Sequence, residues 1–463
     1  MNDREYDYTK LPFRDSDLPI VIRENVSNAP QSRKEAVLIT VAIVLMTLCD
    51  RLRFKYPFDK VLHALLAQGI IEAPPSTGKR FVDDIVRQII DPTLGARDEE
   101  QRLIEQKYRE KKASRKANEK IGEPPQTTIR CLPAATSKTV LNKRADMYKR
   151  VLGDTTTFWM YAEELAQLTD AGHQGYSNLR TILRVAYDLG SKFGQDFASD
   201  NSYSAISDIN FCCLFCATPN DVDEFFNKRS ILGGNVTRVD LIQLNDELGA
   251  EPAEFKDMTD DQQATIDRTL KLLMDNTYTN EGSLQPTFLL DMSWLYKDIR
   301  KWCKEKADEA LRAGDTALDV FRRRSSVSAC RIAALCYYLY LLDQGVDIRK
   351  FCKGEETLPE KTLLRIQKLC RKIYRWSAER ILQPMLTRWG TRYNELLKAR
   401  EEDAQKGEKK TLFDQLTTVF TRDQINLLIR ENGMTTESRF FLSQWKAKGW
   451  IEKIDKNQFR KLV

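Results

Sequence analysis

Apolar residues change their spacing near residue 72, and this change predicts a strand followed by a helix. The run Leu65–Ile71 is almost continuously apolar, as expected for a buried strand. Beyond residue 80 the apolar positions recur at helical spacing, at Phe81, Val82, Ile85, Val86, Ile89 and Ile90. The segment between them contains two prolines and a glycine, which favour a loop.

Strands and helices continue to alternate up to about residue 250. Apolar or β-branched runs predict strands at Thr127–Leu132, Thr155–Ala162 and Phe211–Ala217, with a further strand after Arg238. Helical patterns lie between them. This alternation predicts an α/β fold around a mostly parallel sheet, whose ligands bind outside the carboxyl ends of the strands.

The pattern divides the chain into four regions. Residues 1–32 are polar, contain three prolines and predict an extended arm. Residues 33–250 form the predicted α/β core, in which residues 91–125 are a charged, largely helical insertion. Residues 251–410 predict an all-helical domain, and residues 411–463 predict a separate unit.

The loop after the first strand carries an incomplete phosphate-binding pattern. The full pattern, Gly-x-x-x-x-Gly-Lys-Ser/Thr, follows a strand and opens a helix, where backbone N–H groups and the lysine hold phosphates. Ala73 replaces the first Gly and Arg80 the Ser/Thr, and Arg80 has no acceptor atom for magnesium. Nucleotide binding is therefore better supported than hydrolysis, and an ordinary Pro-Pro turn is the alternative. The candidate ATP-binding residues are Ser76, Thr77, Gly78, Lys79 and Arg80.

Acidic and polar residues follow two of the other predicted strands. Glu163 stands where an acid would hold magnesium, and Glu164 where one would orient water. Thr218 or Asn220 would contact a terminal phosphate, and Arg238 is expected at the same carboxyl edge of the sheet. The alternative for the two acids is the first turn of a helix, where the macrodipole favours negative charge.

Composition is that of a soluble globular protein, with 42% hydrophobic and 30% charged residues. The N-terminus is polar, and ten cysteines without a secretory signal predict free thiols in the cytoplasm. No apolar run reaches the length of a membrane span, so no membrane partner is expected. The net charge of +6 is concentrated at residues 101–120, which hold eight basic and three acidic residues. Such a helix is either a solvated spacer or an arm that faces phosphates.

The last 53 residues have the pattern of a winged helix-turn-helix. A helix at Arg422–Arg430, a turn, a second helix at Thr436–Lys448 and a hairpin ending near Lys461 follow one another. Residues 411–463 hold nine basic and six acidic residues, which favours DNA over a protein partner. The expected DNA-binding residues are Arg439, Gln444, Lys446, Lys448, Lys453, Lys456 and Arg460.

The order of these parts resembles the helicase-like P-loop ATPases, often of primase-helicase type, that phages and bacterial mobile elements encode. The resemblance rests on short segments: Ala73–Arg80, Arg97–Glu123, Phe158–Glu164, Leu214–Pro219, Gly233–Arg238, Ala317–Leu342 and Leu412–Lys461. It implies a RecA-like or AAA-type P-loop core with a helical insertion, an all-α lid and a terminal winged helix. It further implies ATP and magnesium as cofactors, DNA and other replication proteins as partners, and a homo-oligomer such as a ring. Arg238 would then be an arginine finger for a neighbouring subunit.

Two functions are compatible with these features. The first is a replicative helicase or helicase-derived factor of a mobile element. The alternative is a non-catalytic DNA-binding scaffold with a degenerate ATPase core, which Arg80 favours because its guanidinium could occupy the place of the metal. A metal-dependent nuclease that uses Glu163 and Glu164 lacks the additional Asp, His or Lys residues such a site needs.

Overall fold

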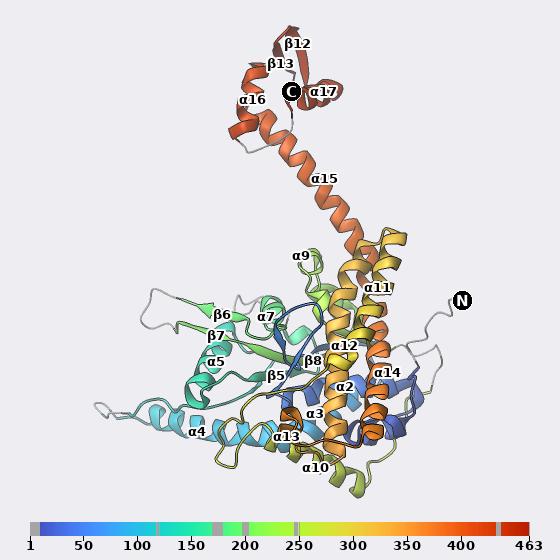
Figure 1. Cartoon of the computed structure of the whole chain (residues 1–463). Helices are drawn as coiled ribbons and strands as arrows, with labels where there is room; N and C mark the ends of the chain where they lie inside the picture. Colours follow the sequence, from blue (N-terminus) through green and yellow to red (C-terminus); the bar gives the residue numbers. More distant parts are fainter. Residues whose placement is uncertain are drawn as a thin grey trace. The chain divides into compact units, whose positions relative to one another are not determined.

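A five-stranded parallel sheet lies at the centre of residues 1–391 in the computed structural model of the chain (Figure 1). The structure describes residues 10–116, 119, 121–168, 179–196, 203–244, 249, 251–431 and 437–462. The sheet has the order β4-β5-β8-β3-β9. Its strands are β3 (Gln68–Glu72), β4 (Cys131–Leu132), β5 (Thr157–Ala162), β8 (Asn210–Ala217) and β9 (Asp240–Gln243). The predicted α/β core with a parallel sheet is confirmed.

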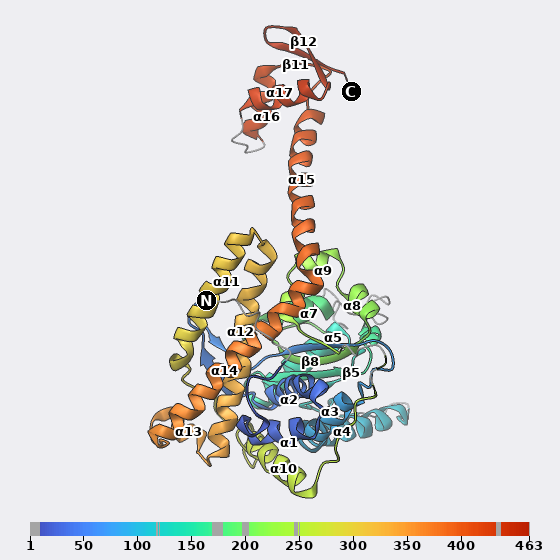
Figure 2. The same cartoon turned by 90° about the vertical axis from the view of Figure 1, so that its right-hand side faces the viewer.

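Helices cover both faces of this sheet (Figure 2). On one face lie α1 (Ile20–Asn28), α2 (Lys34–Leu48), α3 (Arg80–Ile90), α4 (Ala96–Ala113) and α10 (Asp260–Asp275). On the other lie α5 (Lys138–Leu152), α7 (Leu179–Val185), α8 (Pro219–Phe225) and α9 (Lys228–Leu232). Every residue of β3 and β8 is buried, which explains the continuous apolar run of β8 from Phe211 to Ala217. Strand β3 begins at Gln68, three residues after the predicted start at Leu65.

Smaller sheets extend the core. Strands β1 (Leu52–Lys55), β2 (Leu62–His63) and β10 (Phe288–Leu289) form a three-stranded sheet, and β6 (Lys192–Gln195) pairs with β7 (Ala205–Asp208). We did not predict these strands, because runs of two to four residues carry too little periodicity to be recognised.

Four further helices belong to the same unit: α11 (Tyr296–Ala313), α12 (Thr316–Asp343), α13 (Ile348–Lys353) and α14 (Glu360–Met385). Helix α12 is long and apolar enough to cross a membrane, but its apolar window is completely buried within the protein. It packs against α14 as a core helix, as its all-round apolar pattern predicted.

Within residues 1–391, the observed elements differ from the expected division at two places. Residues 20–28 form α1 rather than an extended arm, because Val21, Ile22 and Val26 bury one helical face. The expected division at residues 250/251 is also absent from the described chain. There β10 pairs with β1, and Arg380 of α14 donates to the carbonyl of Leu241 in β9 at 2.9 Å. The helices after residue 251 thus complete the core of residues 1–391.

Residues 392–463 form a second unit with its own apolar core. It starts within α15 (Thr391–Asp414), so the expected boundary at residues 410/411 falls inside a continuous helix. Helices α16 (Arg422–Glu431) and α17 (Ser438–Ala447) are followed by β12 (Ile451–Asp455) and β13 (Gln458–Lys461). Strand β11 (Val419–Thr421), which we did not predict, pairs with β13.

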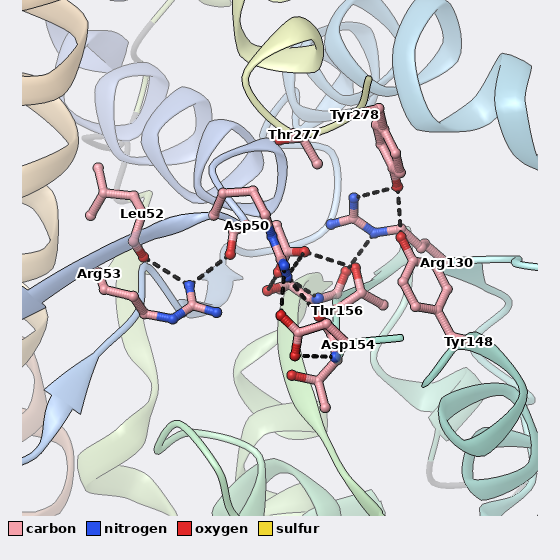
Figure 3. A network of polar contacts seen from close by, with 12 residues as sticks. Asp50, Leu52, Arg53, Arg130, Tyr148, Asp154, Thr156, Thr277 and Tyr278 are labelled. Atoms are coloured by element: carbon pink, nitrogen blue, oxygen red, sulfur yellow. Dashed lines mark hydrogen bonds and ion pairs between the residues drawn. The ribbon is translucent and has the colours of Figure 1, made fainter. Parts of the chain in front are cut away.

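A buried network of polar groups fixes the amino edge of the central sheet (Figure 3). Asp50, which follows α2, accepts hydrogen bonds from the backbone N–H and the hydroxyl of Thr157 at 2.9 and 2.8 Å. It also pairs with Arg51 at 2.9 Å. Arg130 donates to the carbonyls of Thr157 and Thr47 and to the hydroxyl of Tyr278, at 2.7–3.0 Å. These bonds join α2, β5 and the segment after α10.

Burial of Asp240 at the start of β9 makes the stability of the protein depend on pH. Burial raises the pKa of Asp240 to about 6, although Arg380, Arg331 and the hydroxyl of Ser328 oppose the shift. The folded state therefore binds a proton more tightly than the unfolded state, and the free energy of unfolding falls as pH rises from about 4 to 6.

We predict that Asp240→Asn removes this dependence. From pH 4 to pH 7 the variant should gain roughly 2–3 kcal/mol of stability relative to the wild type. Urea unfolding of both proteins across this range tests the prediction. Parallel stability profiles would show that Asp240 does not titrate in this window.

Candidate functional site

The loop between β3 and α3 has the backbone geometry of an anion cradle. Ser76 and Gly78 have positive φ angles of 66° and 74°, and only glycine adopts such an angle without strain. Within the described part of the chain, no backbone N–H from Ser76 to Lys79 has a hydrogen-bond acceptor. One hydrogen bond anchors the loop to the segment before α2: the guanidinium of Arg33 donates to the carbonyl of Thr77 at 3.3 Å. These N–H groups and the start of α3 can bind a negatively charged group.

Lys79 lies across the carboxyl ends of the two central strands. Its ammonium is 3.3 Å from the carbonyl oxygen of Ala217, which ends β8, and 3.4 Å from that of Ala73, which follows β3. Both contacts are long for a charged donor, so the ammonium can exchange them for a stronger acceptor. The thiol of Cys216 has its pKa raised to about 11 by burial, and the charge of Lys79 opposes this rise.

Carboxylates gather beside the loop. Glu163 and Glu164 directly follow β5 and are both exposed. Glu163 and Asp83, on the first turn of α3, both line a cavity of about 450 Å³. We did not predict Asp83 as a site residue, although an acid beside the apolar positions of α3 was a usable signal.

Arg80 stands among these acids. Its Nε lies 3.0 Å from an oxygen of Asp84 and 3.7 Å from one of Asp83. The hydrogen bond and charge of Asp84, followed by the charges of Asp83 and Glu163, raise the pKa of Arg80. The described residues include no group of three or more His, Cys, Asp or Glu side chains that could hold a metal ion.

The residues after β8 are near the loop, but one of them already has a structural role. Thr218 caps α8: its hydroxyl and backbone N–H both donate to Asp221, at 2.8 and 2.9 Å. Asn220 is exposed on the first turn of that helix.

Arg238 is not at the carboxyl edge, contrary to our expectation. It precedes β9, whose first residue Asp240 pairs with Gly69 near the start of β3, so it lies at the amino edge. In a parallel sheet, residues that precede a strand lie at the amino edge and residues that follow it lie at the carboxyl edge. Arg238 precedes its strand, and our expectation did not take this into account. Arg238 donates to the carbonyl of Gly234 at 2.8 Å and lies 5.9 Å from the ring of Tyr187. Its role towards a neighbouring subunit stays a prediction.

Two ion pairs that we did not predict lie at the carboxyl edge of the sheet, and both involve Arg388. Arg388 lies 3.4 Å from an oxygen of Glu72 at the end of β3 and 3.1 Å from one of Asp223 in α8. It also donates to the carbonyl of Pro219 at 2.9 Å. Burial raises the pKa of Glu72, and the charge of Arg388 opposes this shift. Glu72, Asp223 and Arg388 are far apart in the sequence, so no motif spacing could predict that they form ion pairs.

A second, larger cavity includes residues of the loop in its wall. It has a volume of about 810 Å³ and lies between α1, α3, α10 and residues 253–258, with Gly78 and Arg80 at its wall. The rings of Phe81 and Phe255 stack there, 5.3 Å apart. Asn28 and Gln88 add amide groups to the lining.

In the second unit, six of the seven expected DNA-binding residues are exposed: Arg439, Lys446, Lys448, Lys453, Lys456 and Arg460. Gln444 is the exception. It is half-buried in α17, and its amide oxygen is enclosed without a hydrogen-bond partner. Arg439 pairs with Glu437 at 2.5 Å and Arg460 with Glu452 at 3.0 Å.

No protein-family model matches this chain, and no curated protein is significantly similar to it in sequence.

Proposed function

We propose that this chain is a DNA-associated P-loop NTPase-like protein of RecA-like or AAA type, a replicative helicase or helicase-derived factor. The observation that carries the proposal is the β3–α3 loop. Its N–H groups from Ser76 to Lys79 have no acceptor in the described chain, and the Lys79 ammonium lies at the carboxyl ends of β3 and β8, against the carbonyls of Ala73 and Ala217. Both features favour the phosphates of a nucleotide.

The topology of the sheet supports a ligand at this position. Strands β3 and β8 are neighbours, but α3 leaves β3 towards one face of the sheet and α8 leaves β8 towards the other (Figure 2). In open α/β sheets, ligands bind in the crevice formed where neighbouring connections diverge in this way. Lys79 bridges the ends of these two strands.

The adjacent cavity supports a nucleotide rather than phosphate alone. At about 810 Å³ it is in the size range of small-molecule sites. Phe81 and Phe255 supply apolar surface, and Asn28 and Gln88 supply amide groups that can hydrogen-bond a base. A nucleotide with its phosphates on the loop would extend from Gly78 into this space.

Magnesium fits the site in part. Asp83 and Glu163 are the carboxylates that would hold it, and a bound ion would neutralise charge on the phosphates. Arg80 occupies the position where a hydroxyl ligand is expected and pairs with Asp83 and Asp84. This observation favours the second candidate, a DNA-binding scaffold that binds nucleotide without turnover.

The second unit supports association with DNA. Its order of two helices followed by a hairpin, with β11 completing a three-stranded sheet, is compatible with a winged helix. Helix α17 buries Phe441, Leu442 and Trp445, and its exposed side carries Arg439 and Lys446. In a winged helix this exposed side would face the DNA.

Arg80→Ser separates the ATPase from the scaffold. If the core is a decayed ATPase, the serine hydroxyl restores a magnesium ligand, and magnesium-dependent affinity for ATP should rise roughly tenfold. Turnover should appear or increase. Arg87→Ser is the matched control, because Arg87 also pairs with Asp83, at 2.9 Å, but lies two helical turns from the loop.

Each outcome of this experiment is informative. Equal ATP binding by wild type and Arg80→Ser, without turnover in either, would establish the scaffold. If neither protein binds ATP, the proposed nucleotide site does not exist.

A further inference from the structure

The C-terminal half of α4 and the residues after it form a strongly basic segment. From Lys107 to Lys116 the chain has six basic residues and one acidic residue, Glu110, and all six basic side chains are exposed. Cations at a helix C-terminus are favoured by the macrodipole, so this charge alone does not indicate a ligand. The surroundings of the helix give the additional evidence.

The acids on the inner side of α4 are used to fix the helix in place. Asp98 accepts a hydrogen bond from the backbone N–H of Arg130 at 2.8 Å. Glu105 accepts one from the hydroxyl of Thr127 at 2.5 Å and pairs with Arg144 of α5. These contacts and the arginine charge lower the pKa of Glu105 to about 2, against the effect of its partial burial. The helix therefore has a fixed orientation, with its basic side chains outward.

A cavity of about 360 Å³ lies between α4, α5 and residues 124–127. Lys112 of α4 and Lys143 of α5 both line it and are exposed. In the part of the chain that the structure describes, neither lysine forms an ion pair. Tyr108, Pro125 and Val140 add apolar surface to the same cavity. Lys143 is on another helix, so the dipole of α4 does not explain its position.

We infer that this α4–α5 groove binds a single strand of nucleic acid, with Lys112 and Lys143 on its phosphates. A cationic groove with aromatic or apolar surface is the usual form of a site for single strands, because phosphates and bases are bound together. The inference rests on the proposed association with DNA and adds a second contact within residues 1–391, separate from α17. An acidic peptide is the competing occupant of such a groove.

Salt dependence of binding tests the inference. Full-length protein is titrated into labelled oligothymidylate at several KCl concentrations, as wild type and as Lys112→Ala/Lys143→Ala. Loss of two phosphate contacts should reduce the slope of log K against log salt by about 1.4 and lower affinity at low salt by about an order of magnitude. Lys112→Arg/Lys143→Arg keeps both charges and should behave as wild type.

Lys301→Ala/Lys304→Ala is the matched control, because it removes two exposed lysines from α11. It should leave the slope unchanged. An unchanged slope in Lys112→Ala/Lys143→Ala, or an equal decrease in the α11 control, overturns the groove. In a competition experiment, displacement of the labelled oligonucleotide by polyglutamate at a lower concentration than by unlabelled oligothymidylate would also overturn the inference. That result would indicate that the groove binds an acidic peptide.

Two results separate this inference from the proposed function. If wild type binds no DNA at all, both fail. If Arg439→Ala/Lys446→Ala in α17 abolishes binding and Lys112→Ala/Lys143→Ala does not change it, only the groove fails. The thermal unfolding of each variant is compared with that of wild type, since exposed substitutions should leave it within a few degrees.

Discussion

Replacement of Asp50 by alanine should destabilise the protein by about 3–5 kcal/mol, because it leaves buried cations and donors without their acceptor. Asp50 is only 2% exposed, and Arg51 beside it is equally buried. Burial alone would raise the pKa of Asp50, but Arg51, Arg130 and Arg53, with the hydrogen bond from Thr157, lower it. The carboxylate is thus charged in the folded protein and holds the amino edge of the sheet.

Asp154→Ala is the matched control for this prediction. Asp154 also pairs with Arg51, at 2.8 Å, but its side chain is 50% exposed. Arg51 keeps its ion pair with Asp50 in this variant, and water can reach the place of the half-exposed carboxylate, so the loss of Asp154 should cost only about 1 kcal/mol. Urea unfolding followed by tryptophan fluorescence compares the two variants. If Asp50→Ala is no more destabilising than Asp154→Ala, the network does not hold the sheet.

Replacement of Lys79 by alanine should lower the affinity for ATP about 100-fold. A charge-assisted hydrogen bond to a phosphate contributes roughly 1.5–3 kcal/mol, and a factor of 100 corresponds to about 2.7 kcal/mol. Stability should change little, because Lys79 makes only two long contacts with carbonyl oxygens. Lys60→Ala, which removes an exposed lysine from the loop between β1 and β2, is the control. Calorimetric titration measures both affinities, and equal values would remove Lys79 from the site.

The hydrophobic pattern predicted the central strands well, and local spacing explains why. Strand β8 is buried along its whole length, so it appears as a continuous apolar run from Phe211. The apolar run Leu65–Ile71 located β3, although that strand begins only at Gln68 and includes Glu72. The strand, loop and helix around Gly78 and Lys79 were predicted for the same reason. Arg238 was misplaced because the expectation did not distinguish the residues before a strand from those after it.

Contacts between distant parts of the chain could not be predicted. Arg388 forms an ion pair with Glu72, and Asp50 accepts a hydrogen bond from Thr157. Both contacts depend on tertiary packing, which the local hydrophobic pattern does not predict. The helices after residue 251 were predicted as helices, but their place in the core depends on contacts such as that between Arg380 and β9. The half-burial of Gln444 depends on which face of α17 packs against the core, and the presence of one polar residue in the sequence does not predict that orientation.

We propose that the β3–α3 loop binds the phosphates of a nucleotide. Competition against a fluorescent ATP analogue bound to full-length protein tests it most directly, with ATP, ADP and adenosine as competitors in the presence of magnesium. If the phosphates are bound by the loop, the analogue should bind saturably, and ATP and ADP should displace it, whereas adenosine at the same concentration should not. Displacement by adenosine as effectively as by ATP, or no saturable binding, would contradict it.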